Sequence, residues 1–198
     1  MELEFSARVH EKKVASDGVV GMIFLLATEM MFFAGLISAY IVNKAGAMAW
    51  PPPGQPRLPI AVTGVNTVVL LASGVTMWMF AAKNKRNTLS DNKVIGKNLM
   101  MLTVLLGATF LAIQGSEWAK MLHFGLTTKS SMYGAFFYTI IGAHGIHVLA
   151  GVFTLFYMMR KITTGTHPSP KSLIDSTAIY WIFVVAIWPC LYYLVYLS

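Results

Sequence analysis

The chain has 198 residues, of which 56% are hydrophobic and 12% charged, and its formal net charge at pH 7 is +7. This composition excludes an ordinary water-soluble domain, because the apolar residues form blocks of roughly 20 residues, the length of a helix that crosses a membrane. The single cysteine, Cys190, excludes a disulfide or a thiolate metal cage within one chain.

Five apolar blocks predict membrane-spanning helices, at about residues 18–43, 60–82, 97–120, 132–160 and 176–197. None of them alternates apolar and polar residues as the strands of a membrane β-barrel do. The loops are too short for a soluble domain, so the sequence predicts an all-α polytopic membrane protein, a five-helix bundle forming a single membrane domain over residues 1–198. Residues 1–17 are polar and no small-residue cleavage site follows the first block, so we expect no cleavable signal peptide.

Lys and Arg residues are distributed unevenly over the two sides of this predicted bundle. The N-terminal tail, the second loop and the fourth loop carry eleven of them, whereas the first and third loops carry four. The positive-inside rule therefore predicts a cytoplasmic N-terminus and a C-terminus outside. Because the positive charge is spread over short loops that face anionic lipid headgroups, we expect no nucleic-acid partner.

The first predicted span contains a carboxyl group, Glu29, within the apolar stretch GMIFLLATEMMFF (21–33). Glu29 lies about 11 residues into this span, so a rise of about 1.5 Å per residue places it roughly 17 Å deep, near the middle of the membrane. An ionised group at this depth costs a few kcal/mol or more, and such groups usually face protein or water and have partners.

Four other polar side chains in the spans are candidate partners. His144 and His147 lie at a similar depth in the fourth span, and their i, i+3 spacing places them on one helix face. Gln114 and Glu117 have the same spacing near the outer end of the third span. For the two histidines, hydrogen bonds to neighbouring helices are the simplest interpretation.

Three interpretations of Glu29 remain open on the residues alone. The carboxyl group is protonated and joins two helices, since removal from water favours its neutral form. Alternatively, it belongs to a proton pathway. In the third, Glu29 forms a two-His-one-carboxylate metal site with His144 and His147. Haem ligation by this chain is disfavoured, because two histidines on one helix cannot grip a haem from opposite faces.

Four motifs occur in order along the spans: ATEMMFFAGLISAY (27–40), LLGATFLAIQGSEW (105–118), YGAFFYTIIGAHGIHVLAG (133–151) and AIYWIFVVAIW (178–188). The third is the most specific, since Tyr-Gly, Phe-Phe and His-Gly-x-His-Val-x-x-Gly all fall in register. From residue 18 to its C-terminus the chain resembles subunit III of the haem–copper respiratory oxidases of the cytochrome c oxidase type, in a short five-helix bacterial form.

This resemblance implies a non-catalytic subunit of a proton-pumping terminal oxidase in a bacterial cytoplasmic (inner) membrane. It implies that haem and copper belong to partner subunits I and II, and that this chain holds no cofactor or metal. It also implies that the chain stabilises subunit I, binds phospholipid and assists proton uptake. A subunit IV or a larger respiratory supercomplex would be further partners. Glu29 matches the family's intramembrane carboxyl group, which reacts with hydrophobic carbodiimides.

Three alternatives to this assignment remain open. They are the related subunit that accompanies nitric oxide reductase, subunit III of a quinol oxidase, and a stand-alone iron enzyme with Glu29, His144 and His147 as ligands. Two departures from the family also stand out. Larger members have two more helices before the first span, and members often have His and Asp in the last helix where this chain has Ile182 and Val185.

Overall fold

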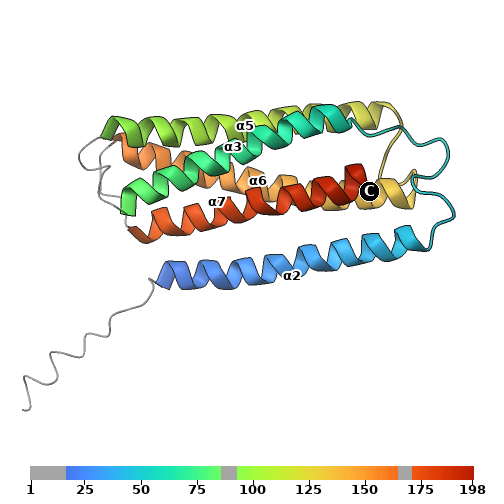
Figure 1. The fold of residues 1–198 in the computed structure, drawn as a ribbon, viewed down its shortest axis with the longest axis horizontal. Helices are drawn as coiled ribbons and strands as arrows, with labels where there is room; N and C mark the ends of the chain where they lie inside the picture. Colours follow the sequence, from blue (N-terminus) through green and yellow to red (C-terminus); the bar gives the residue numbers. More distant parts are fainter. Residues whose placement is uncertain (1–16, 86–92, 165–170) are drawn as a thin grey trace, which may run out of the picture.

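Five long helices run side by side in the computed structural model, which describes residues 17–85, 93–164 and 171–198 (Figure 1). The helices are α2 (Asp17–Ala45), α3 (Ile60–Lys85), α5 (Lys93–His123), α6 (Met132–Thr164) and α7 (Lys171–Tyr192), and a π-helix, η1 (Tyr193–Leu197), continues α7. All five are long and apolar enough to cross a membrane, which confirms the predicted all-α fold with five helices suitable as membrane spans.

The helices extend beyond the apolar blocks that predict them. The largest differences are at α7, which begins at Lys171 rather than near residue 176, at α6, which continues to Thr164 rather than to 160, and at α5, which begins at Lys93 rather than at 97. Helical hydrogen bonding continues into these polar ends because nothing in the sequence stops it at the edge of the hydrocarbon. Four basic residues that support the predicted orientation lie outside the described residues: Arg8, Lys12, Lys13 and Arg86.

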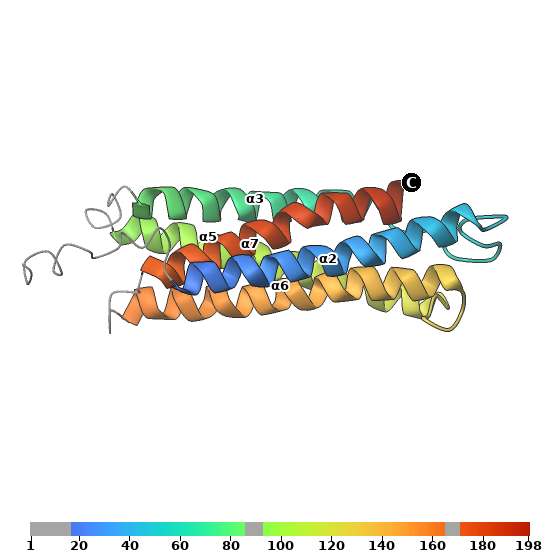
Figure 2. The same ribbon diagram turned by 90° about the horizontal axis from the view of Figure 1, so that it is seen from below.

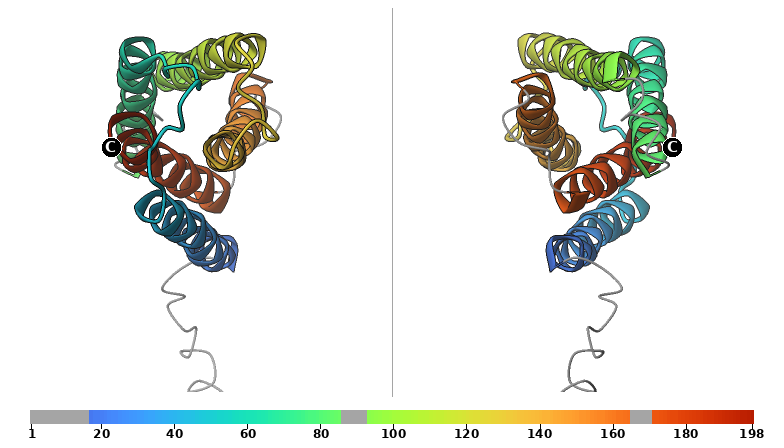
Figure 3. Two further views of the ribbon diagram at one scale, coloured as in Figure 1. Left: turned by 90° about the vertical axis from the view of Figure 1, so that its right-hand side faces the viewer. Right: turned by 90° about the vertical axis from the view of Figure 1, so that its left-hand side faces the viewer.

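Helices α3, α5, α6 and α7 form a four-cornered bundle when viewed end-on, and α2 lies outside it (Figure 3). Helix α2 packs mainly along α7 and less extensively along α6 (Figure 2). Only 6% of its span is buried inside the chain, against 28% to 44% for the other four helices. Phe24 and Met31 of α2 are 70% and 75% exposed, so most of the surface of this helix is not covered by the rest of the described chain.

Hydrogen bonds link α2 to the rest of the described chain at its middle and at its C-terminal end. In the middle, Glu29 meets His147 of α6. At the end, Trp50 donates a hydrogen bond to the Tyr40 hydroxyl at 3.1 Å, and its ring packs against Tyr133 of α6 with 5.5 Å between centroids. These polar contacts act together with the buried rings of Phe33 and Tyr40 to hold α2 against the bundle.

The bundle closes around Trp181 of α7, which is fully buried. A Cβ atom at Gly107 of α5 would lie 2.8 Å from Cη2 of Trp181, and one at Gly151 of α6 would lie 2.7 Å from its Cε3. Two glycines on different helices therefore make room for one indole ring. Small residues have this role in membrane bundles, where packing rather than hydrophobicity holds helices together.

We predict that Gly151→Ala destabilises the bundle by about 1–3 kcal/mol, because the new methyl group forces Trp181 from its position. The measurement is the free energy of unfolding in mixed micelles during an SDS titration. Gly145→Ala is the matched control on the same helix, since a Cβ there meets nothing within 4 Å. Equal unfolding free energies for the two variants would contradict this account of the packing.

Candidate functional site

The intramembrane acid and one intramembrane base are in direct contact. Oε2 of Glu29 lies 2.8 Å from Nε2 of His147, so the contact joins α2 to α6. The two side chains are 23% and 17% exposed, which places the pair at the edge of the bundle rather than at its centre. An isolated carboxylate in the membrane is costly and needs a partner. The partner of Glu29 is His147, the second histidine of the His-Gly-x-His-Val motif.

The geometry of the ring determines how many protons the pair holds. Nδ1 of His147 lies 2.7 Å from the carbonyl oxygen of Ala143, and a carbonyl only accepts, so Nδ1 carries a proton. At 2.8 Å, Nε2 and Oε2 of Glu29 must then share one further proton, because two bare acceptors would repel each other. Whichever atom holds that proton, the pair has no net charge, and this lowers the cost of placing it in the membrane.

Aromatic rings flank the Glu29–His147 pair. The centroids of Phe32 and Phe33 lie 6.5 and 5.3 Å from that of the His147 ring. On α7, the hydroxyl of Tyr180 donates to the backbone oxygen of His147 at 3.1 Å. The His147 ring is therefore held by side chains of α2, and the backbone of the same residue is held by Tyr180 of α7.

His144 lies next to this pair but faces the interior of the four-helix bundle. Its ring is 1% exposed and stacks on Trp188 of α7 with 4.8 Å between centroids. Phe33 contacts both histidines, at 6.4 Å from His144 and 5.3 Å from His147, so the two lie on neighbouring parts of one helix surface. The enclosed Nε2 of His144 has no hydrogen-bond partner among the described residues.

The metal interpretation of Glu29, His144 and His147 does not fit this arrangement. Glu29 and His147 are bonded to each other, whereas His144 is enclosed by aromatic rings. Within the described ranges, no three or more His, Cys, Asp or Glu side chains come together in a group that could hold a metal ion.

Gln114 belongs to a second polar contact, deeper in the bundle. Its Nε2 donates to the Tyr196 hydroxyl at 3.0 Å, and its Oε1 accepts from Nδ2 of Asn66 at 3.4 Å. The same Asn66 amide donates to the backbone oxygen of Phe110 at 3.1 Å. The network joins α3, α5 and η1. The sequence did not lead us to predict it, although Asn66, an amide inside the apolar run of α3, indicated a polar contact there.

Glu117 lies one turn beyond Gln114 and is 5% exposed. Its Oε1 pairs with Nζ of Lys120 at 2.8 Å, and the lysine side chain is 59% exposed. The pair therefore places a buried carboxylate beside a cation that reaches the surface. Glu117 does not contact Glu29 or either histidine through any bond that the described residues show.

The fold and these contacts define a polytopic α-helical membrane protein whose intramembrane acid and base neutralise each other at a helix contact. The family model of Cytochrome c oxidase subunit III matches residues 2–198, and the chain belongs to this family. Membership implies partner oxidase subunits in a respiratory enzyme.

Curated relatives agree along nearly the whole chain. A probable cytochrome c oxidase subunit 3 from Nocardia farcinica is 36% identical over 195 residues, which cover 96% of this chain and 92% of that protein. The cytochrome c oxidase subunit 3 of Synechocystis sp. is 33% identical, with 89% and 74% covered. That of Pelomedusa subrufa is 31% identical, with 94% and 72% covered.

We predict that Glu29→Leu and His147→Leu are coupled in a double-mutant cycle. Each single change strands a polar partner in the membrane, whereas the double change removes both, so the coupling should be about 1 kcal/mol. The measurement is the free energy of unfolding in mixed micelles. Glu117→Leu with His147→Leu is the control pair, and its coupling should be near zero. Additive effects of the Glu29 and His147 changes would contradict the observed bond.

Proposed function

We propose that this chain is the non-catalytic subunit III of a proton-pumping haem–copper terminal oxidase, in which subunits I and II hold the haems and the copper. The Glu29–His147 contact carries the proposal. These two side chains bind each other and join α2 to the bundle instead of forming a metal site, as a non-catalytic subunit requires. The chain then acts by presenting a fixed helical surface that stabilises subunit I and binds phospholipid.

A role in proton uptake belongs to the same proposal. The Glu29–His147 pair shares a transferable proton at mid-membrane, and both side chains remain partly exposed at the edge of the bundle. The alternatives are the related five-helix subunit that accompanies nitric oxide reductase and subunit III of a quinol oxidase. The relatives from Synechocystis sp. and Pelomedusa subrufa are cytochrome c oxidase subunits 3 and that from Nocardia farcinica is a probable one, which favours a cytochrome c oxidase.

We predict that gentle purification through a tag on this chain yields a complex with haem a bands in its reduced-minus-oxidised spectrum. Mass spectrometry of the same sample should identify a copper-binding oxidase subunit. Haem b and c bands with a nitric oxide reductase would contradict the assignment. A colourless protein without companions would contradict the proposed assembly as a whole.

We also propose that residues 1–198 form one membrane domain in the bacterial inner membrane, with the N-terminus in the cytoplasm and the C-terminus outside. The excess of Lys and Arg on the N-terminal side supports this orientation. Two positions at opposite ends of the bundle test it: Arg57, before α3, and Lys83, in the last turn of α3.

In a Cys190→Ser background, we predict that a membrane-impermeant maleimide labels Arg57→Cys in intact cells and labels Lys83→Cys only after the cells are opened. Cys190 is replaced because it is the chain's single cysteine and is exposed. Mass spectrometry of the purified chain measures the labelled fraction. The reverse pattern would show that the orientation is inverted.

A further inference from the structure

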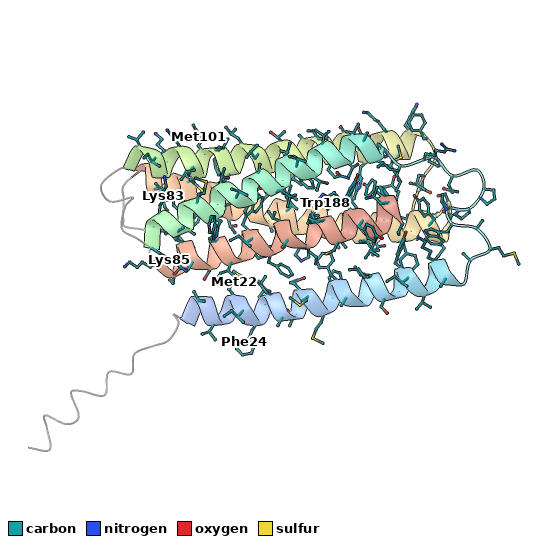
Figure 4. The ribbon with its side chains drawn as sticks, in the orientation of Figure 1. Met22, Phe24, Lys83, Lys85, Met101 and Trp188 are labelled. Atoms are coloured by element: carbon teal, nitrogen blue, oxygen red, sulfur yellow. The ribbon has the colours of Figure 1, made fainter. Side chains whose placement is uncertain are left out.

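A pocket of about 210 Å³ lies at the end of the bundle where α2 finishes and α3 begins. The loop of residues 46–59 crosses this end from α2 to α3 (Figure 3). Figure 4 labels Lys83 and Lys85 at the opposite end of the molecule. None of the residues that line the pocket belongs to the Glu29–His147 pair.

The place of the pocket decides from which side an occupant enters. A groove that takes a lipid chain runs along two neighbouring helices on the outside of a bundle. This pocket is instead bounded by Ile60, the first residue of α3, by Tyr133, the second residue of α6, and by Ser198, which follows η1. Because α2 and the loop complete its lining, it lies among the ends of several segments, and an occupant enters from the aqueous phase.

Two polar groups of the pocket have no partner in the described part of the chain. The guanidinium of Arg57 makes no ion pair or hydrogen bond there, including with Ser198. Tyr133 is only 5% exposed, and its hydroxyl also makes no hydrogen bond. That oxygen is not among the enclosed polar atoms, so it is open to the pocket that Tyr133 lines. A cation beside a hydroxyl donor suits a carboxylate.

Aromatic rings hold the walls of the pocket in place. The Trp50 ring lies 5.5 Å from Tyr40 and 5.5 Å from Tyr133, centroid to centroid. Nε1 of Trp50 donates to the Tyr40 hydroxyl at 3.1 Å, and the Tyr196 hydroxyl accepts from Gln114 at 3.0 Å. The pocket is therefore preformed, and an occupant need not order these side chains to bind.

The charges around this end of the bundle favour an anion. Nζ of Lys44 donates to Oγ of Ser198 at 3.0 Å, so a second cation lies beside the pocket. Lys129 lies in the loop before α6. Among the described residues, Glu117 is the acidic side chain at this end, and it is paired with Lys120. Complementary charge selects partners and fixes their register.

The size of the pocket indicates what kind of anion it takes. Pockets for small molecules have volumes of roughly 300–1,000 Å³, so this one is too small for a typical ligand of that class. It matches a single amino-acid side chain instead. Side chains that anchor one protein on another fill preformed pockets of this kind, near the centre of an interface.

We propose that this pocket binds an acidic side chain from a segment of another oxidase subunit at this end of the bundle. Arg57 binds the carboxylate through its guanidinium, and the hydroxyl of Tyr133 donates a hydrogen bond to the same group. The ring of Trp50 covers the hydrocarbon part of the bound side chain. The inference rests on the proposed function, because it requires the partner subunits.

The Arg57→Lys variant of the purified complex tests whether a carboxylate occupies the pocket. A water-soluble carbodiimide joins a lysine amine to a contacting carboxylate with loss of one water molecule, and it leaves arginine unreacted. We expect mass spectrometry to find the substituted position joined to an Asp or Glu of a partner subunit, and to find no such product in the unmodified complex. A product joined to a carboxylate of this chain would overturn the proposal.

The rate at which the complex dissociates gives a second measurement. The complex is held through a tag on this chain, diluted in detergent, and followed by the haem absorbance that is released. We expect Arg57→Gln to speed release about tenfold and Tyr133→Phe about fivefold, because each removes one bond to the carboxylate. Lys129→Gln is the matched control, since Lys129 is a cation at the same end that does not line the pocket. Equal rates in Arg57→Gln and Lys129→Gln would overturn the proposal.

The Tyr133→Phe variant separates a binding role from a structural one. Its hydroxyl makes no hydrogen bond in the described chain, so the unfolding free energy of the chain alone should not change. A lower value would assign the hydroxyl to the fold and overturn its role in the pocket. An intact complex without the crosslinked product, as expected for a bound phosphate or free anion, would overturn this inference alone. A chain purified without companions would overturn the proposed function and this inference together.

Discussion

The hydrogen bond between Glu29 and His147 is the constraint on which the position of α2 depends. This helix lies outside the four-helix bundle, and only 6% of its most apolar stretch is buried, so its apolar packing depends on a few side chains such as Phe33 and Tyr40. In the hydrocarbon region a polar contact has few competitors, which makes one acid–base pair an effective helix contact. Because Nδ1 of His147 is committed to Ala143, the pair satisfies its bonds without any net charge.

The other four helices are held by a different combination of contacts. Trp181 fills a space that Gly107 and Gly151 leave open, and the Asn66–Gln114–Tyr196 network joins α3 and α5 to η1. Both contacts lie inside the bundle, where lipid cannot replace them. The bundle is thus a rigid support, and α2 is an added helix whose exposed face is available to lipid and to partner subunits.

The sequence predicted the features that depend on the composition of single segments. Five apolar blocks predicted five helices, and the cost of an isolated carboxylate in the membrane predicted a partner for Glu29. The sequence did not show whether His147 or His144 is that partner. Residues i and i+3 are separated by only a small rotation about the helix axis, so the placement of α2 decides which ring meets the acid. The space around Trp181 also depends on how three helices meet, which no single segment encodes.

The contacts of His147 require a proton on Nδ1 and one further proton shared between Nε2 and Glu29. Solid-state nitrogen NMR of the full chain in lipid bilayers, with ¹⁵N-labelled histidine and His147→Gln to assign the signals, tests this directly. We expect a protonated Nδ1 and an Nε2 signal that changes in Glu29→Gln. A bare Nδ1 in His147, or an Nε2 signal unaffected by the change at Glu29, would contradict it.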